Sequence, residues 1–240
     1  METVKIFCIG LSRTGTTSLC QALEILGYNT IHFPIHLFTH PEVISDELSF
    51  EPKRKLNLYW NWRRRKELEV LNLKFDKDMM NKYEAFGDLP VPLLFETLDR
   101  KFPGSKFIYT YRDEKKWLKS MKWLYKEGAV LWKHGLLNDE INIAAYGTVS
   151  YDSDRLLDSY RRHHQHVMQH FVNRPDDLLV LNIDKEKITL KQLSEFLSIE
   201  TINTFYPKAN KSKKVSKQQM VQYWLERNLP FYGLIKKTKI

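Results

Sequence analysis

The segment IFCIGLSRTGTTSL, residues 6 to 19, constrains the fold more than any other part of the chain. It begins as a short apolar run, passes through a turn between Gly10 and Gly15, and continues from Thr16 with leucines at helical spacing. A strand, a glycine-bearing turn and a helix start, in this order, create a concave group of backbone N–H donors that suits phosphate or sulfate. The sequence therefore predicts an anion-binding turn.

This turn differs from the phosphate loop of nucleotide hydrolases. Its two glycines have the spacing of the G-x-x-x-x-G-K-[ST] motif, but Thr16 takes the place of the lysine and Thr17 that of the Ser/Thr. The cation of the turn is Arg13. Four residues separate Cys8 from Arg13, one fewer than the Cys-x5-Arg pattern of cysteine phosphatases needs. We therefore expect anion binding without ATPase or cysteine-phosphatase chemistry.

Short apolar runs alternate with helical patterns along much of the chain. Residues 29–33, 106–111 and 177–183 are typical of strands, and residues 155–171 carry apolar side chains on one helical face. This alternation predicts an α/β fold, a three-layer sandwich in which helices flank a central, mainly parallel sheet. Residues 34–100 are less regular, and we expect short helices and loops over most of them.

Composition sets the broad class of the protein. With 240 residues, 42% of them hydrophobic, the chain can bury a substantial core, and we expect a single domain over residues 1–240. A formal charge of +9 favours anionic partners. Two cysteines make no disulfide framework, and no apolar stretch approaches the ~20 residues of a membrane span. No secretory signal begins the sequence, so we expect a soluble, cytoplasmic protein.

The stretch LSRTGTTSL resembles the 5′-phosphosulfate loop of sulfotransferases that use 3′-phosphoadenosine-5′-phosphosulfate (PAPS). The cytosolic branch usually has lysine where this chain has Arg13. A second motif of that family, a strand ending in an arginine followed by a helical serine, binds the 3′-phosphate. FIYTYRDEKKWLKS places Arg112 at a strand end and Ser120 eight residues later, as in that motif. Both motifs occur in the family's order, and the resemblance implies a P-loop-like fold and a PAPS-dependent sulfotransferase.

The resemblance also implies which residues bind the donor. FYPKANKSKK is similar to a loop that closes over the nucleotide in some branches of the family. The donor-binding residues implied are Ser12, Arg13, Thr14, Gly15, Thr16, Thr17, Ser18, Arg112, Ser120, Asn210 and Lys211. Residues 34–85 match no family segment, and we expect this insertion on the acceptor side. Residues 208–240 form a basic C-terminal segment.

Two residues are the predicted catalytic groups. Arg13 is expected to act as an electrostatic clamp, because a guanidinium grips two oxygens but does not give up a proton. The segment beginning DLPVPLLFETLDRK resembles the stretch in which a catalytic histidine precedes Leu-Pro, and this chain has Asp88 at that place. A carboxylate serves as the base if its surroundings raise its pKa. Alternative bases are Glu96, His32 and His36.

The chain departs from the family pattern at three places. Glu114 replaces a proline that often follows the second-motif arginine, and the Arg-Lys-Gly loop of the cytosolic branch is absent. Asn182 stands where such enzymes place a tyrosine near adenine. The adenine contacts are therefore left open.

Other functional hypotheses are weaker. The histidines at positions 163, 164, 166 and 170 lack the glutamate of the H-E-x-x-H motif, so we expect structural roles and no metal. YWNWRRRK, residues 59 to 66, has the aromatic and basic content of nucleic-acid binders, yet a basic helix face or a wall of the acceptor cleft is the favoured interpretation.

We expect transfer of a sulfonate to a hydroxyl or amine of a small-molecule, carbohydrate or other acceptor, with no nucleic-acid partner. The main alternative is a non-catalytic nucleotide- or RNA-binding module that keeps the turn and the basic charge. A small-molecule kinase is a weaker alternative, because the turn has no lysine.

Overall fold

A five-stranded parallel sheet forms the centre of the protein. The computed structural model describes residues 4–34, 77–128, 139–185, 187–200, 205–209 and 214–228. The strands are β1 (Ile6–Cys8), β2 (Thr30–His32), β3 (Ala85–Gly87), β4 (Lys106–Tyr111) and β5 (Leu178–Asn182), in the order β2-β3-β1-β4-β5. Neighbouring strands pair in parallel throughout. This sheet confirms the predicted α/β class.

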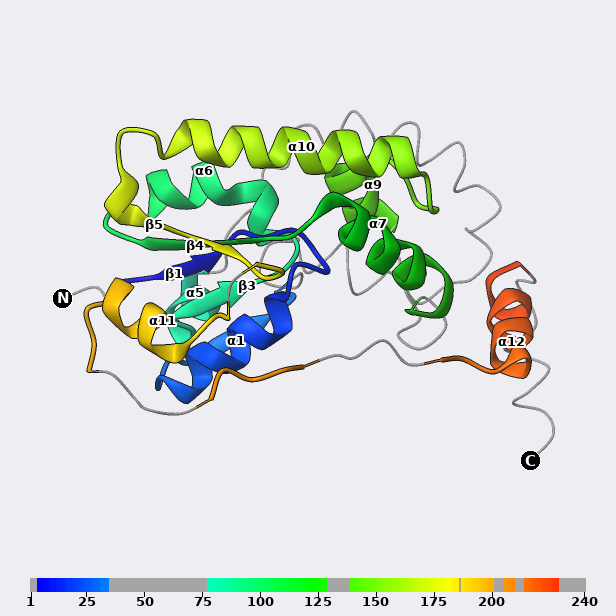
Figure 1. Cartoon of the computed structure of the whole chain (residues 1–240), viewed down its shortest axis with the longest axis horizontal. Helices are drawn as coiled ribbons and strands as arrows, with labels where there is room; N and C mark the ends of the chain where they lie inside the picture. The colour runs from blue at the N-terminus through cyan, green and yellow to red at the C-terminus, as the bar shows by residue number, and fades with distance from the viewer. Residues whose placement is uncertain are drawn as a thin grey trace.

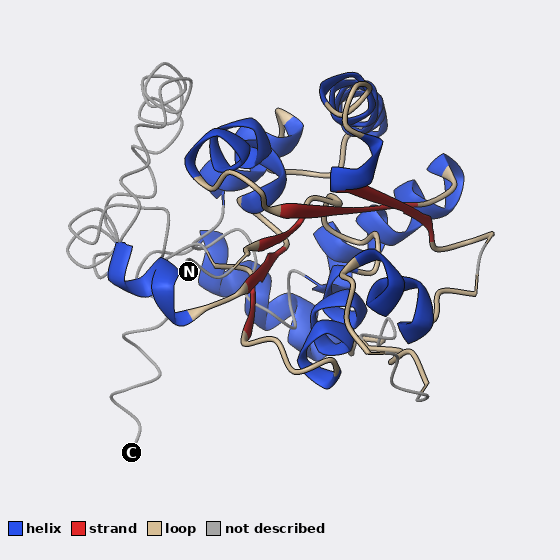
Figure 2. Cartoon of the chain, turned by 90° about the vertical axis from the view of Figure 1, so that its left-hand side faces the viewer, coloured by secondary structure: helices blue, strands red, loops and turns tan. Residues whose placement is uncertain are grey.

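Helices cover both faces of the sheet (Figures 1 and 2). The helices are α1 (Thr16–Ile25), α5 (Lys77–Lys82), α6 (Val91–Lys101), α7 (Glu114–Trp123), α9 (Asp139–Tyr146), α10 (Ser153–His170), α11 (Leu190–Phe196) and α12 (Lys217–Asn228). A π-helical turn spans Leu124–Gly128, and a 3-10 turn spans Pro175–Asp177. Helices α6 and α10 pack on one face and α1 and α11 on the other, which gives the three layers of the predicted sandwich.

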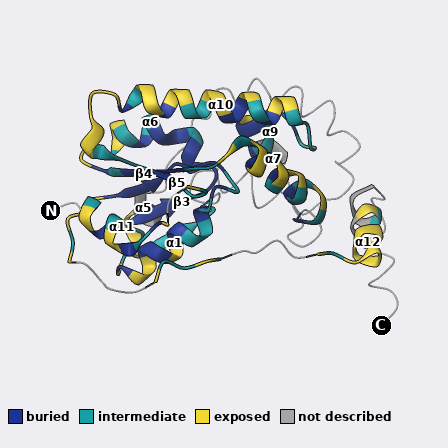
Figure 3. Cartoon of the chain, in the orientation of Figure 1, coloured by how far each residue is buried: buried dark blue, intermediate teal, exposed yellow. Residues whose placement is uncertain are grey.

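The core follows from the alternation of side chains along the strands. Phe7 and Phe107 enter the cluster under α6 and α10, whereas Ile6 and Ile108 enter the cluster under α1 and α11. Since helices cover both faces, both sets of strand side chains are buried and apolar (Figure 3). A third cluster lies beyond the carboxyl ends of the strands and contains Leu11, Leu89, Trp117, Met121, Leu124, Ile141, Ala145, Tyr146, Leu156 and Tyr160.

Side-chain caps determine where several helices begin. The Asp152 carboxylate accepts hydrogen bonds from two backbone N–H groups at the start of α10, so this helix begins slightly before the predicted residue 155. Asp113 accepts from Lys116 N and caps α7. Gly27 adopts φ +93° just beyond α1, a left-handed conformation that commonly ends a helix.

One strand was not predicted. β3 lies between β2 and β1 in the sheet, in a region where short helices and loops were expected. Its three residues are too few to show a strand period, and pairing with strands on both sides makes them extended. Residues 35–76, the main part of the predicted acceptor-side insertion, lie outside the described residues. Within the described part of the chain, no helix has the length and apolar character that crossing a bilayer requires.

Candidate active site

The predicted anion-binding turn lies where β1 ends and α1 begins. Gly15 is the N-cap of α1 with φ +90°, and no side chain caps this helix. A helix start without a side-chain cap presents N–H donors to an anion. A Cβ on Gly10 would lie 2.2 Å from the Thr110 hydroxyl oxygen, so the turn packs closely on β4. The Thr14 hydroxyl donates to Leu11 O at 2.7 Å and fixes the turn from inside.

Ser12, within the turn, makes three hydrogen bonds, two with residues of the third cluster and one with Asp88. Its backbone N–H donates to the Tyr146 hydroxyl at 3.2 Å, and its carbonyl accepts from the Trp117 indole at 3.0 Å. Its hydroxyl donates to Asp88 Oδ1 at 2.7 Å. The predicted donor-binding serine is thereby linked to the predicted base.

Asp88 makes four polar contacts that occupy both of its carboxylate oxygens. Oδ1 accepts from the Ser12 hydroxyl and from Leu89 N at 2.8 Å. Oδ2 lies 3.2 Å from His32 Nε2 and accepts from the Thr16 hydroxyl at 3.4 Å. A carboxylate offers about four lone-pair sites, so the protein itself uses the acceptor capacity of Asp88.

Asp88 and His32 shift each other's pKa values in opposite directions. Burial acts to raise the pKa of Asp88, but hydrogen bonding and charge from His32, together with the Ser12 and Leu89 donors, bring it below its usual value. Burial acts to lower the pKa of His32, but its hydrogen bond and attraction to Asp88 bring it above the usual value. The condition set for Asp88 as a lone base, a raised pKa, is therefore not met.

The alternative bases lie in different surroundings. His32 is the last residue of β2, and its Nε2 lies 3.2 Å from the hydroxyls of both Thr16 and Thr17. Glu96 instead pairs with His166 of α10 at 2.7 Å. His36 lies outside the described residues. Of the alternatives that the structure describes, His32 is the one in contact with Asp88.

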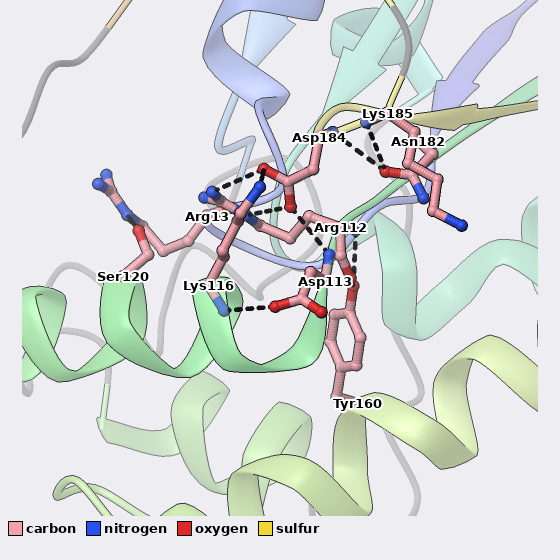
Figure 4. Close-up of polar contacts among 9 residues, drawn as sticks. All are labelled: Arg13, Arg112, Asp113, Lys116, Ser120, Tyr160, Asn182, Asp184 and Lys185. Atoms are coloured by element: carbon pink, nitrogen blue, oxygen red, sulfur yellow. Dashed lines mark hydrogen bonds and ion pairs between the residues drawn. The ribbon is translucent and has the colours of Figure 1, made fainter.

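Arg13 connects the turn with the second motif. It adopts φ +70°, and its Nε donates to the Ser120 hydroxyl at 2.9 Å (Figure 4). Its guanidinium carbon lies 4.8 Å from the centroid of the Trp123 ring. The pKa of Arg13 is below its ordinary value, mainly because the side chain is buried. The negative charge of Asp88 acts to raise this pKa, and the positive charge of Arg112 acts to lower it. Ser120, predicted to act together with Arg112, contacts Arg13 in this structure.

Arg112 is fixed through both its backbone and its side chain. The Tyr160 hydroxyl accepts from Arg112 N at 2.9 Å and donates to Arg112 O at 2.8 Å. The guanidinium donates to Asp184 through Nε at 3.4 Å and Nη2 at 3.2 Å, and to Arg13 O through Nη1 at 3.4 Å. The two predicted motifs are thus in direct contact at one end of the sheet.

Three contributors to this site were not predicted as such. Asp184 follows β5, and a polar residue beyond the carboxyl end of a strand was a signal that could have found it. Tyr160 was predicted only as part of the apolar face of α10, and its hydroxyl contact could not be read from that pattern. The contact of the Trp117 indole with Ser12 O likewise joins segments that are distant in the chain.

The described part of the predicted closing loop reaches α1. Ala209 N donates to the Ser18 hydroxyl at 2.9 Å. Asn210 and Lys211, the donor-binding residues predicted in that loop, lie outside the described residues. Their role stays a prediction.

The four histidines of α10 have protein partners. Burial lowers the pKa of His163 to about 4, so this ring is neutral near pH 7 and its Nε2 donates to Ile9 O at 2.7 Å. His164 contacts the Tyr109 hydroxyl, His166 pairs with Glu96, and His170 pairs with Asp99. These contacts agree with the structural roles predicted for them. Across the ranges that the structure describes, no group of three or more potential ligands could hold a metal ion.

Comparisons with known proteins give the family. The chain is 30% identical over 124 residues to the Ava biosynthesis cluster protein M of Aspergillus versicolor, an alignment that covers 50% of this chain and 42% of that protein. The chain thus spans less than half of that relative's length. A crystal structure of a sulfotransferase from Alicyclobacillus acidocaldarius aligns with 98% of this chain and 97% of its own, at 16% identity and a TM-score of 0.49. The family model of the sulfotransferase domain matches residues 5–215, and the chain therefore belongs to the sulfotransferase domain family.

Proposed function

We propose that this protein transfers a sulfonate group from PAPS to a hydroxyl or amine of an acceptor. The observation that carries the proposal is the presence of two groups of anion-binding donors at the same end of the sheet. One is the turn with Arg13 and the open start of α1, and the other is Arg112 at the end of β4. PAPS supplies the sulfonate when bound. It carries one anionic group at the 5′ position and one at the 3′ position, so each of the two cationic donor groups would bind one of them.

The turn provides the donors for the 5′ side. The N–H groups at the start of α1, the hydroxyls of Thr16 and Thr17, and the Arg13 guanidinium would stabilise negative charge that develops on the transferred group. Removing one donor of this kind from an active site typically costs about 2.7–4 kcal/mol of transition-state stabilisation. Arg13 contributes charge but no proton, because a guanidinium stays protonated.

The second group provides the donors for the 3′ side. Arg112, with Ser120 nearby on α7, would hold the 3′-phosphate. Since Ser120 accepts from Arg13, this hydroxyl also aligns the cation of the first group with the second. Ser18 and the Ala209 backbone bring the chain that precedes Asn210 and Lys211 to the start of α1, which supports a closing role for those two residues.

His32 and Asp88 together provide the base. The side chain of His32 is 31% exposed and that of Asp88 is 13% exposed, so the imidazole is the more accessible partner. Its Nε2 faces Asp88, and its Nδ1 has no hydrogen-bond partner among the described residues. We assign proton acceptance to His32 and stabilisation of the resulting imidazolium to Asp88. Residues 34–85 are assigned to the acceptor.

Nucleotide binding tests the donor assignment. We expect adenosine 3′,5′-bisphosphate (PAP), the product left after transfer, to raise the unfolding temperature more than AMP or ATP with Mg²⁺. A ligand at ~100 times its Kd stabilises the folded state by about 2.7 kcal/mol, which thermal shift detects readily. Arg112→Ala should abolish the preference for PAP over AMP.

Arg174→Ala is the matched control, because Arg174 pairs with Asp99 and precedes β5, at the opposite end of the sheet from Arg112. This variant should keep the preference. Equal stabilisation by ATP with Mg²⁺, or salt-sensitive RNA binding that PAP leaves unchanged, would contradict the proposal.

A further inference from the structure

Asp184 contacts two cations, Arg112 of the second anion-binding group and Lys116 of α7 (Figure 4). Its Oδ1 is 3.2 Å from Arg112 Nη2 and 3.5 Å from Lys116 Nζ. Its Oδ2 accepts from Asp113 N at 2.9 Å and from Arg112 Nε at 3.4 Å. The Asp184 side chain is 13% exposed and that of Arg112 is 20% exposed, so solvent screens this pair less than an ordinary surface ion pair.

The turn after β5 determines where this carboxylate points. Asn182 is buried, and its Oδ1 accepts from Asp184 N at 3.0 Å and from Lys185 N at 3.2 Å. An asparagine side chain that binds the backbone two and three residues further on fixes a tight turn. Asn182 therefore orients the turn that carries Asp184.

The contact with Asp184 leaves part of Arg112 available for a ligand. Three of the five guanidinium N–H groups have protein partners, two at Asp184 and one at Arg13 O. The remaining two, one on each terminal nitrogen, have no partner among the described residues, and they can donate to two oxygens of one phosphate. The side of the guanidinium that carries Nε faces Asp184, so the carboxylate selects which edge is presented.

We propose that Asp184, placed by Asn182, is the positioning residue that aims Arg112 and Lys116 at the 3′-phosphate of the nucleotide. The proposal depends on the donor assignment given above. It distinguishes two possible effects of a carboxylate beside a phosphate-binding arginine. A positioning carboxylate strengthens 3′-phosphate binding by holding the guanidinium in place, whereas a competing counter-ion weakens it.

Calorimetric titration of PAP and AMP into the full-length wild-type protein, Asp184→Ala and Asp184→Asn tests this inference. AMP lacks the 3′-phosphate, so the ratio of the two dissociation constants isolates that group from general effects on folding. We expect Asp184→Ala to weaken PAP binding about tenfold and to leave AMP binding within about twofold, in line with the 10–100-fold losses when outer partners of metal ligands are removed. Asp184→Asn should show a smaller loss in the same direction.

Glu114→Gln is the matched control for charge. Glu114 is also a carboxylate near the start of α7, but it pairs with exposed Arg161, and no hydrogen bond or ion pair joins it to Arg112. Its replacement should leave the PAP-to-AMP ratio unchanged. An unchanged ratio in both Asp184 variants, or tighter PAP binding, would overturn the positioning role while leaving the donor assignment intact. No preference for PAP in the wild-type protein would overturn both.

Discussion

His32 and Asp88 have different pKa values, so the pH dependence of kcat can show which of them is the base. If His32 is the base, kcat falls as pH decreases through its pKa, which Asp88 raises above the ordinary histidine value of ~6.5. Asp88→Asn removes the hydrogen bond and the charge of Asp88, the main contributions that raise this pKa, and leaves burial, which lowers it. The acidic limb of the kcat profile should therefore move to lower pH. The measurement is kcat against pH for both proteins.

His32→Gln should lower kcat by about 10²–10⁴-fold, the usual contribution of a general base. If Asp88 were itself the base, its pKa below the ordinary value would place the acidic limb below that of a free carboxylate. Asp88→Asn would then lower the plateau value of kcat and abolish this limb, and no limb would appear between it and the ordinary histidine pKa. That outcome would restore Asp88 as the base and exclude His32.

At the scale of single residues, sequence reasoning located the groups that belong to a motif. Arg13, Arg112 and Asp88 were predicted as site residues because each occupies a fixed position relative to a turn or a strand end. Asp184 and the Tyr160 hydroxyl act through contacts between segments distant in the chain, at sequence separations of 72 and 48 residues from Arg112. Such contacts depend on the order of strands in the sheet, which residue spacing does not contain.

At the scale of elements, the turn before α1 depends on Gly15. Its φ of +90° lies in the left-handed region, where an L-residue with a Cβ costs about 1–2 kcal/mol. A Cβ there would meet Ile183 at an ordinary 3.5 Å, so the cost of Gly15→Ala comes from the backbone and not from a clash. We expect a loss of that size in unfolding free energy, together with weaker PAP binding, because the N–H groups of the turn change direction.

Gly27→Ala is the control for this prediction, since Gly27 has φ +93° at the other end of α1 with open space around its Cα. It should lose similar stability in denaturant titrations and keep wild-type PAP affinity. If both variants bound PAP equally well, the turn would not be the 5′ anion site.

The elements that could be predicted were those long enough to repeat the side-chain pattern of a strand or a helix several times. The strand predicted at 106–111 has the bounds of β4, and the apolar face predicted for 155–171 is buried along α10. β3 was not predicted because three residues are too few to show the alternation of a strand. Its partners, β1 and β2, also come from a different part of the chain. Its position still matters for the candidate site, since Asp88 follows it directly.

At the scale of the whole molecule, α10 joins the body of the sheet to the active site (Figure 1). Its last turns place Val167 in the cluster under α6, and its first turns place Leu156 and Tyr160 in the third cluster. The third cluster also contains Trp117 and Tyr146, which hold the Ser12 backbone. Through this cluster, α10 contacts the elements that hold both of the proposed anion-binding groups.

Tyr160→Phe tests this link between core and site. The change keeps the ring that stacks on Trp117, whose centroid is 4.3 Å away, but removes the hydroxyl that serves both Arg112 N and Arg112 O. These backbone groups are part-buried, so leaving them unpaired should cost at most the value for a buried group, about 1–3 kcal/mol, which denaturant unfolding measures. Because the same hydroxyl fixes the backbone of Arg112, the PAP-to-AMP preference should also decrease.

Tyr109→Phe is the matched control, since the Tyr109 hydroxyl also contacts α10, at His164, but does not touch Arg112. It should lower stability without altering the preference for PAP. A Tyr160→Phe protein that lost stability and kept the full preference would show that the third cluster supports folding alone. Loss of both properties in Tyr160→Phe, against loss of stability alone in Tyr109→Phe, would show that core packing positions the 3′-phosphate site.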